Sequence, residues 1–502
     1  MAREVNDQGR GSSHVVLDME MASPPLIPDL PPIGDGRASC HADPLVNLIR
    51  SKLPKRNAGG GRNPSICWVH PDMRKVEEEA YEPKLVSIGP LHRKKDRLLP
   101  MEQVKLEYLS GLLDRHNENR LENYIAVIRS CLLDARAQYP EKIELSDDEF
   151  VEMLVVDGCF IIEYLAKRIF ATTKETALLA SVRWGFAHLR RDLLLLENQI
   201  PFFVLTGLFR ETKIPFTGNR KEPLNLIELV LRFLRIEKPP KVNLEPGKVL
   251  HLLHIYHLCL DPECVEEPHQ RSCGELAMYP LKKSKDLISM FFFAFLYLIF
   301  IRHWPPFFGP TKKLKAPREI PCATELRAAG IKFNKKVAPR GQTACYLKVS
   351  FRDGILEIPF LSVDGTTGAR LRNLMALEQC CGKVGNHFTS YCVFMDNIIN
   401  TAGDVAILRS RGILESKLGS DAEVANLFNN LCRGTHLKYD KHYNKEIFEK
   451  VVTFSEFAHH KWRASLVHNY FSNPWAMFSV LAGFLLIALA GIQAYFTVFP
   501  RK

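Results

Sequence analysis

Hydrophobic residues recur at helical spacing through the first half of the chain. In the segment that begins at Met101, Val104 and Tyr108 fall on one side of a helix, and Glu102 and Lys105 are expected on the solvent side. The same spacing predicts further helices over residues 121–136, 146–170, 190–209, 223–235 and 246–259.

These helices predict a bundle-like helical domain over residues 45–260. The helix over 146–170 opens with Ser146 and, three residues later, Glu149, which is the spacing of a capping box. Its apolar residues surround it almost completely, so we expect it at the centre of the domain. Residues 190–209 read as an apolar helix that is interrupted by Glu197-Asn198-Gln199 and bent at Pro201.

The second half of the chain mixes two periodicities. Alternating apolar residues on both sides of an Asp-Gly pair predict a β-hairpin near residues 345–361. Helical spacing returns over residues 367–379, 391–400, 421–431 and about 441–471. The fold class is therefore mainly α, with a second, mostly helical region over residues 321–471 that contains a small β-hairpin.

Residues 475–499 form an apolar run of 25 residues without a charge. A helix of this length extends about 37 Å, enough to cross a hydrocarbon core of about 30 Å. Residues 474–499 are therefore predicted to form a C-terminal transmembrane helix, a single-pass tail anchor that leaves the bulk of the chain in the cytosol. The predicted anchor residues are Trp475, Phe484, Leu485, Leu486, Tyr495 and Phe499, and the flank in the headgroups is Arg501 and Lys502.

A second apolar run, residues 287–308, lies in a connector over residues 261–320. Its uninterrupted part is short for a membrane span. Three interpretations stay open: an interfacial or packed helix, a second span, and an unstructured insert or a segment included through a gene-model error. The formal net charge of the chain, +11, is concentrated nearby, since residues 281–350 carry 14 basic and three acidic residues. This window predicts contact with anionic lipids.

Composition adds two further expectations. Residues 1–44 are polar and rich in proline, contain no signal-peptide pattern, and are predicted to form a disordered tail. The 13 cysteines follow no framework of a secreted domain, so reduced thiols and a cytosolic environment are expected.

Three acidic residues in apolar helices are candidates for acid–base chemistry: Asp157, Glu163 and Glu197. Burial raises the pKa of a carboxyl group, as general acids require. No nucleophile or histidine with a recognisable context accompanies them. We therefore favour buried hydrogen-bond networks, and an uncharacterised enzyme remains the alternative.

Other site chemistry receives little support. Histidines and cysteines gather in one segment, but their spacing matches no common zinc pattern; they are His254, His257, Cys259, Cys264, His269 and Cys273. No glycine-rich nucleotide loop follows a strand, and the basic window lacks the interleaved aromatic residues of a nucleic-acid surface. We expect no metal, no cofactor and no nucleic-acid partner.

Several characteristic sequence segments follow one another along the chain: EPKLVSIGPLH, LPMEQVKLEYL, VVDGCFIIEYL, RRDLLLLENQIPFFVL, ATELRAAGIKF and MDNIINTAGDVAILRSRGIL. Together they resemble the plant family called domain of unknown function 247, from about residue 44 to the apolar C-terminal run. The resemblance implies a single-pass membrane protein without an established enzymatic activity, cofactor or catalytic residue set. Some family members are implicated in self-incompatibility recognition between pollen and stigma in grasses.

These observations lead to one functional expectation. We expect a membrane-anchored plant interaction or recognition protein, possessing a protein partner of unknown identity and no catalytic site, with a role in signalling or self-incompatibility-like recognition. The alternatives are an enzyme that uses the buried acids and a scaffold on anionic lipid surfaces.

Overall fold

The computed structural model describes residues 44–52, 64–170, 185–214, 225–236, 244–245, 247–260, 317–337 and 347–456, with seven positions between 482 and 493. Helix α1 (Pro44–Lys52) belongs to a separate unit, residues 1–60. The predictions for the N-terminal tail before Pro44, for residues 261–316 and for residues 457–471 lie outside the described residues.

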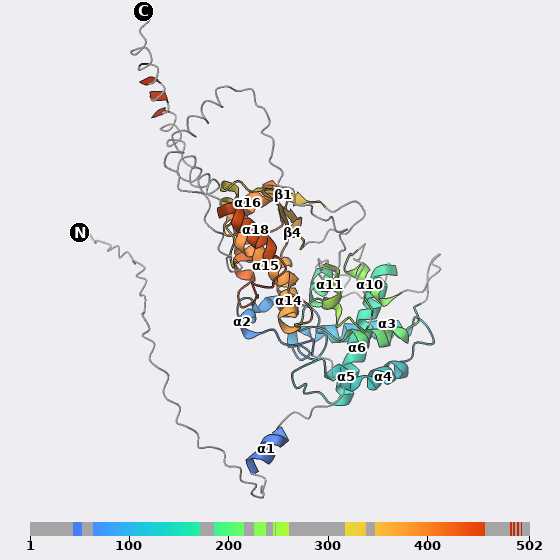
Figure 1. The fold of residues 1–502 in the computed structure, drawn as a ribbon. Helices are drawn as coiled ribbons and strands as arrows, with labels where there is room; N and C mark the ends of the chain where they lie inside the picture. The colour runs from blue at the N-terminus through green and yellow to red at the C-terminus, as the bar shows by residue number, and fades with distance from the viewer. Residues whose placement is uncertain are drawn as a thin grey trace, which may run out of the picture. The chain divides into compact units, whose positions relative to one another are not determined.

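The first region is helical, as predicted. Its helices are α2 (Pro71–Arg74), α3 (Pro100–Leu113), α4 (Leu121–Ser130), α5 (Leu132–Arg136), α6 (Asp147–Phe170), α8 (Gly185–Asp192), α9 (Phe202–Arg210), α10 (Leu226–Phe233) and α11 (Leu252–Leu260), with short 3₁₀ turns η1 (Glu78–Ala80) and η2 (Asp96–Leu98). Helix α6 packs against α3, α4, α9 and α10, so it is the centre of this region (Figure 1).

The sequence of α6 explains its start and its close packing. The backbone N–H of Ser146 donates to Glu149 Oε2 at 2.7 Å and the backbone N–H of Glu149 donates to Ser146 Oγ at 3.2 Å, which confirms the capping box. In the middle of the helix, a Cβ atom on Gly158 would lie 2.3 Å from Leu208 Cδ1 of α9. Glycine at this position therefore permits the close approach of α6 and α9.

The prediction of one bent helix over residues 190–209 is wrong. Helix α8 ends at Asp192, α9 begins after Pro201, and the buried segment between them is irregular. The Asn198 amide donates to the carbonyl oxygens of Val86 and Asp192, and the Gln199 amide donates to those of Leu193 and Leu195, all at 2.8–3.0 Å. Side-chain amides thus satisfy backbone groups that a helix would have paired, and Pro201 cannot donate at all.

Residues 121–136 also form two helices where one was predicted. The chain breaks at Cys131, which ends α4 and precedes α5 with φ −116° and ψ 15°. The Ser130 hydroxyl donates to the carbonyl oxygen of Val127 at 2.7 Å, an alternative to helical pairing at this point.

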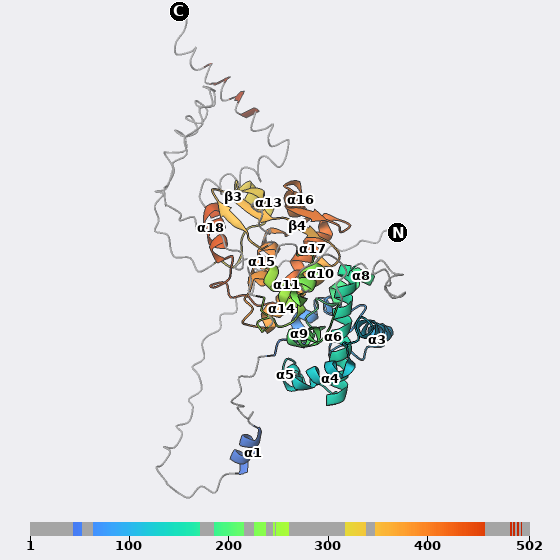
Figure 2. The same cartoon turned by 90° about the vertical axis from the view of Figure 1, so that its right-hand side faces the viewer.

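The second region combines helices with two small sheets. Its elements are α13 (Ala323–Ala328), β1 (Lys332–Lys336), β2 (Ser350–Arg352), β3 (Ile355–Pro359), β4 (Leu361–Val363), α14 (Thr367–Cys380), α15 (His387–Ile398), α16 (Ala402–Ser410), β5 (Leu414–Ser416), α17 (Asp421–Leu431) and α18 (Lys445–Glu456). Figure 2 shows β3 and β4 among the surrounding helices.

The predicted hairpin is confirmed. Strands β2 and β3 pair antiparallel, and the turn between them holds Asp353 at φ 52° and Gly354 at φ 72°. Positive φ at both central residues is the requirement of a type I′ turn, which explains the Asp-Gly pair. Strand β1 adds to β3 in parallel and β4 pairs with β5 in parallel, and neither pairing was predicted.

The helices of the second region largely follow the predictions. Helix α17 begins after Ser420, whose side chain accepts a hydrogen bond from the backbone N–H of Glu423. Helix α15 begins at His387, four residues earlier than expected, because the Glu378 carboxylate of α14 accepts the backbone N–H groups of Phe388 and Thr389, both at 2.8 Å. Helix α16 was not predicted.

Helix α14 joins the two regions through buried polar contacts. Asn373 accepts a hydrogen bond from the backbone N–H of Leu196 at 2.9 Å and donates to the carbonyl oxygen of Ala80 at 2.9 Å. His257 Nε2 of α11 lies 2.9 Å from Glu378 Oε1. Hydrophobic residues from both regions also belong to one buried cluster. The domain boundaries themselves stay a prediction.

Candidate functional site

Asp157 is part of a buried ion pair that supports the fold. Its Oδ1 accepts a hydrogen bond from the Lys105 ammonium at 2.6 Å, and its Oδ2 accepts the backbone N–H of Gly89 at 2.8 Å. Burial raises the pKa of Asp157, and the Lys105 charge acts in the opposite direction. Lys105 itself is 0% exposed, so the prediction that it faces solvent is wrong. The carboxylate on α6 holds the ammonium inside the core.

The other two candidate acids have separate partners. Glu163 accepts two hydrogen bonds from the Arg115 guanidinium, at 2.6 and 2.9 Å. Glu197 lies 2.6 Å from Arg74 and 3.0 Å from His92. The structure therefore does not bring the three carboxylates into one site; each is neutralised in its own network, as favoured from the sequence.

The histidine-rich helix α11 is built into the core. His254 Nδ1 accepts the backbone N–H of Leu250 at 3.1 Å, and burial lowers the pKa of His254 to about 4. Within the described part of the chain, no group of three His, Cys, Asp or Glu side chains could hold a metal ion. The predicted candidates Cys264, His269 and Cys273 lie outside the described residues.

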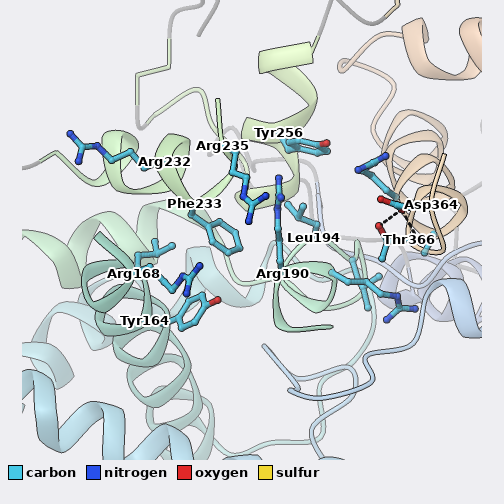
Figure 3. Close-up of a pocket in the computed structure, with 15 residues that line it drawn as sticks. Tyr164, Arg168, Arg190, Leu194, Arg232, Phe233, Arg235, Tyr256, Asp364 and Thr366 are labelled. Carbon is cyan, nitrogen blue, oxygen red and sulfur yellow. Dashed lines mark hydrogen bonds between the residues drawn. The ribbon is translucent and has the colours of Figure 1, made fainter. Parts of the chain in front are cut away.

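A cavity of about 670 Å³ lies where α6, α8, α10 and α11 meet the segment that leads into α14 (Figure 3). Its volume falls in the range of about 300–1,000 Å³ that is typical of small-molecule sites. Six arginines line it: Arg168, Arg190, Arg191, Arg232, Arg235 and Arg370. Asp364 is the one acidic residue among the described lining residues.

Arg190 is the electrostatic centre of this cavity. It is half-buried, and its guanidinium donates to the carbonyl oxygen of Leu234 at 2.8 Å. Burial lowers the pKa of Arg190, and the positive charges of Arg235 and Arg370 lower it further. Among the described residues, no carboxylate lies within 4.0 Å of the guanidinium groups of these three arginines.

Arg235 occupies an unusual backbone position. It follows α10 with φ 57°, and the backbone N–H of Ile236 donates to the carbonyl oxygen of Leu231 at 2.9 Å. This is the left-handed cap that normally carries glycine, and a larger residue there is strained by about 1 kcal/mol. The strain directs the Arg235 side chain towards Arg190 (Figure 3). Strained backbone positions cluster at functional sites.

Two other arginines are occupied by the protein itself. Arg191 contacts the Asp192 carboxylate at 3.0 Å and donates to the carbonyl oxygens of Glu82 and Glu79. Arg232 pairs with Glu228 one helical turn away at 2.8 Å and points away from Arg190 (Figure 3). The positive charges that act together at Arg190 are those of Arg190 itself, Arg235 and Arg370.

Asp364 is fixed beside Arg370, on the wall formed by the segment that leads into α14, and the Arg370 guanidinium donates to the Thr367 hydroxyl at 3.2 Å. Asp364 Oδ1 accepts hydrogen bonds from the backbone N–H and hydroxyl of Thr366, at 2.9 and 2.8 Å, and from the Thr367 hydroxyl at 3.1 Å. The pKa of Asp364 is lowered: burial opposes ionisation, but these hydrogen bonds and the charge of Arg370 outweigh it. Oδ2 has no hydrogen bond to a described residue, so it can accept one from a ligand.

Sequence reasoning missed this cavity. Its cations come from four separate segments of the chain, and in none of them do the arginines form a recognisable motif. The left-handed backbone at Arg235 has no signature in the sequence, since glycine is the usual signal.

The comparisons with known proteins define the family. The chain matches the family described as plant protein of unknown function, domain of unknown function 247, over residues 66–489. This protein belongs to that family. It is 28% identical to UPF0481 protein At3g47200 of Arabidopsis thaliana over 424 residues, which cover 84% of this chain and 83% of the relative. It is 24% identical to putative UPF0481 protein At3g02645 of the same plant over 491 residues, 87% and 89% of the two chains. No solved structure matches significantly.

The predicted membrane anchor falls mostly outside the described residues. Leu485 and Leu486 are helical and 54% and 67% exposed. Trp475, Phe484, Tyr495, Phe499, Arg501 and Lys502 are not described. In the helices that can be followed, none is both long and apolar enough for a membrane crossing.

Proposed function

We propose that this protein is a membrane-anchored plant binding protein that recognises an anionic ligand in the arginine-lined cavity and catalyses no reaction. The observation that carries the proposal is the arrangement of Arg190, Arg235 and Arg370, whose charges converge without a carboxylate partner among the described residues. The proposal thus assigns the interaction and recognition function expected from the sequence to a defined site, the arginine-lined cavity.

The physical argument rests on the cost of this arrangement. Like charges that converge repel one another, and the partly buried Arg190 and Arg370 also lose hydration, whereas Arg235 is exposed. The neighbouring residue, Arg191, illustrates the alternative: its guanidinium group is paired with the Asp192 carboxylate and with a backbone carbonyl oxygen, as expected of an arginine that supports the fold. Arg190 has one backbone acceptor and two cationic neighbours instead. A bound anion supplies the missing charge and makes the site favourable.

The anchoring part of the proposal rests on the apolar run over residues 475–499 and the basic pair that follows it. The folded body faces the cytosol, where it recognises a protein partner according to whether the cavity is occupied. A role in self-incompatibility-like recognition, which the family resemblance implies for some members, is the context that we propose for this step.

Thermal unfolding of the full chain in detergent micelles tests the proposal. Sodium sulfate or inorganic phosphate is compared with sodium chloride at equal ionic strength, so that general screening is held constant. We expect the divalent anions to raise Tm more in the wild type than in Arg190→Met, which should keep only the general stabilisation that sulfate and phosphate give to folded proteins. Arg411→Met removes one exposed charge elsewhere and should retain the effect. An equal rise in all three proteins would contradict the proposal.

A further inference from the structure

Resting on the proposed function, we infer that the ligand of this cavity is a polyol that carries two or more phosphate groups. The protein contacts that select it are the guanidinium groups of Arg190, Arg235 and Arg370 and the free carboxylate oxygen of Asp364.

Several phosphates are required because the cations come from different walls. Arg190 belongs to α8, Arg235 follows α10 and Arg370 belongs to α14. Each guanidinium presents a planar set of donors that matches two oxygens of one phosphate. A cavity of about 670 Å³ is much larger than a single phosphate group, so one such group cannot engage all three walls. A compact ring with phosphates on different carbons can.

The acidic wall selects hydroxyl groups on the same ligand. Phosphate oxygens cannot face Asp364 without repulsion, whereas a hydroxyl group can donate to its Oδ2. Oδ1 is already saturated by Thr366 and Thr367, so the orientation of the carboxylate is set before the ligand arrives. Thr366 is also a lining residue. A ligand that brings phosphates to the three arginines and a hydroxyl group to Asp364, which lies beside Arg370, fits this arrangement.

The remaining walls are aromatic and apolar. Tyr164 and Tyr256 are almost completely buried behind the cavity, and Phe233 and Leu194 line it as well. They exclude water around the guanidinium groups, which strengthens each contact with phosphate. They also accommodate the carbon face of a small ring.

Two sources supply this chemistry: a soluble inositol phosphate and the headgroup of a phosphoinositide lipid. Isothermal titration calorimetry separates them. The full chain is placed in phosphatidylcholine nanodiscs, and the probes are inositol trisphosphate, inositol hexakisphosphate, ATP and inorganic phosphate. A second preparation includes phosphatidylinositol bisphosphate. Weaker apparent binding of inositol trisphosphate in that preparation assigns the headgroup as the source, and unchanged binding assigns the soluble compound.

We expect inositol trisphosphate to bind at least about a hundredfold more tightly than inorganic phosphate, since two further guanidinium contacts are worth about tenfold each. Arg235→Met and Arg370→Met should each weaken it by about tenfold or more. Asp364→Asn keeps the Oδ1 acceptor and removes the negative charge. This variant should bind inositol trisphosphate more weakly than the wild type does. It should bind inositol hexakisphosphate, which has no free hydroxyl group, more tightly.

The outcomes distinguish this inference from the proposed function. Suppose that inorganic phosphate binds the wild type but not Arg190→Met, and that inositol trisphosphate binds the wild type no more tightly than inorganic phosphate does. The inference then fails while the proposed function stands. Tighter binding of ATP than of either inositol phosphate also overturns the inference. If none of the probes binds, both are wrong.

Discussion

The Arg190 guanidinium donates to the carbonyl oxygen of Leu234 at 2.8 Å, which links α8 to the end of α10. The contact brings Arg190 beside Arg235, the residue after Leu234. Arg191 turns to the other side of the helix and pairs with the protein. Two adjacent arginines thus have opposite roles, and this contrast gives the first prediction.

Arg190→Met is expected to leave the free energy of unfolding unchanged or to raise it by up to about 1 kcal/mol in ligand-free protein, because it removes a desolvated charge that repels its neighbours. Arg191→Met should lower it by about 1–3 kcal/mol, because the buried Asp192 carboxylate and the partly buried Glu82 carbonyl oxygen each lose a donor. Urea unfolding of the full chain in detergent measures both. Equal destabilisation by the two variants would show that Arg190 also serves the fold.

Arg235→Gly is predicted to stabilise the protein and to weaken anion binding. Glycine relieves the strain of the left-handed backbone at φ 57°, which should raise the free energy of unfolding by about 1 kcal/mol, less a few tenths for added chain entropy. Arg235→Ala, which keeps the strain and loses the charge, is the control and should weaken binding without the gain in stability. A loss of stability in Arg235→Gly would mean that the side chain is needed for folding.

Asp157→Ala should destabilise the protein by about 3 kcal/mol, because it removes one of the two carboxylates that hold the buried Lys105 ammonium and leaves Glu102 as the other. Glu152→Ala on the exposed face of the same helix should change stability by no more than about 0.5 kcal/mol. Thermal and urea unfolding measure the difference. A normally folded Asp157→Ala protein that loses a bound metabolite would instead support the enzyme alternative.

Stability should fall as the pH drops from about 6.5 towards 4. Burial lowers the pKa of His251 to about 3 and the pKa of His254 to about 4. The positive charge of a protonated neighbouring imidazole ring on the same helix lowers both pKa values further. Below about 6.5 the unfolded chain binds protons that the folded chain excludes, so protonation favours unfolding, by up to about 1.4 kcal/mol per pH unit for each histidine.

His251→Gln should make this dependence less steep, since one proton fewer is taken up on unfolding. Burial also lowers the pKa of His442 to about 4, so His254 and His442 still contribute in the variant. The free energy of unfolding is measured at several pH values between 4 and 6.5 for the wild type, His251→Gln and His436→Gln, the last being an exposed control. An identical slope in the wild type and His251→Gln would refute the assignment.

Local signals in the sequence explain which elements were predictable. The capping residues Ser146 and Ser420 and the Asp353-Gly354 turn act within a few residues, so the sequence indicates them directly. The irregular segment before Pro201 depends on acceptors more than 100 residues away in sequence, such as the Val86 carbonyl that Asn198 reaches. Periodicity carries no information about such contacts.

The candidate site was unpredictable for a similar reason. The interpretation of Asp157, Glu163 and Glu197 as parts of buried networks could be reached from their apolar surroundings, and the geometry agrees with it. The convergence of Arg190 with Arg235 and Arg370 depends on how α8, α10 and α14 pack. No local pattern links these residues.

The most direct test of the central claim is the stoichiometry of anion binding to the full chain, measured by calorimetry with inositol trisphosphate and inorganic phosphate. We predict one site per chain in the wild type and in Arg411→Met. We predict none in the protein that combines Arg190→Met, Arg235→Met and Arg370→Met while its unfolding transition stays cooperative. Binding of equal stoichiometry and affinity in the triple variant would contradict the assignment of this cavity as the ligand site.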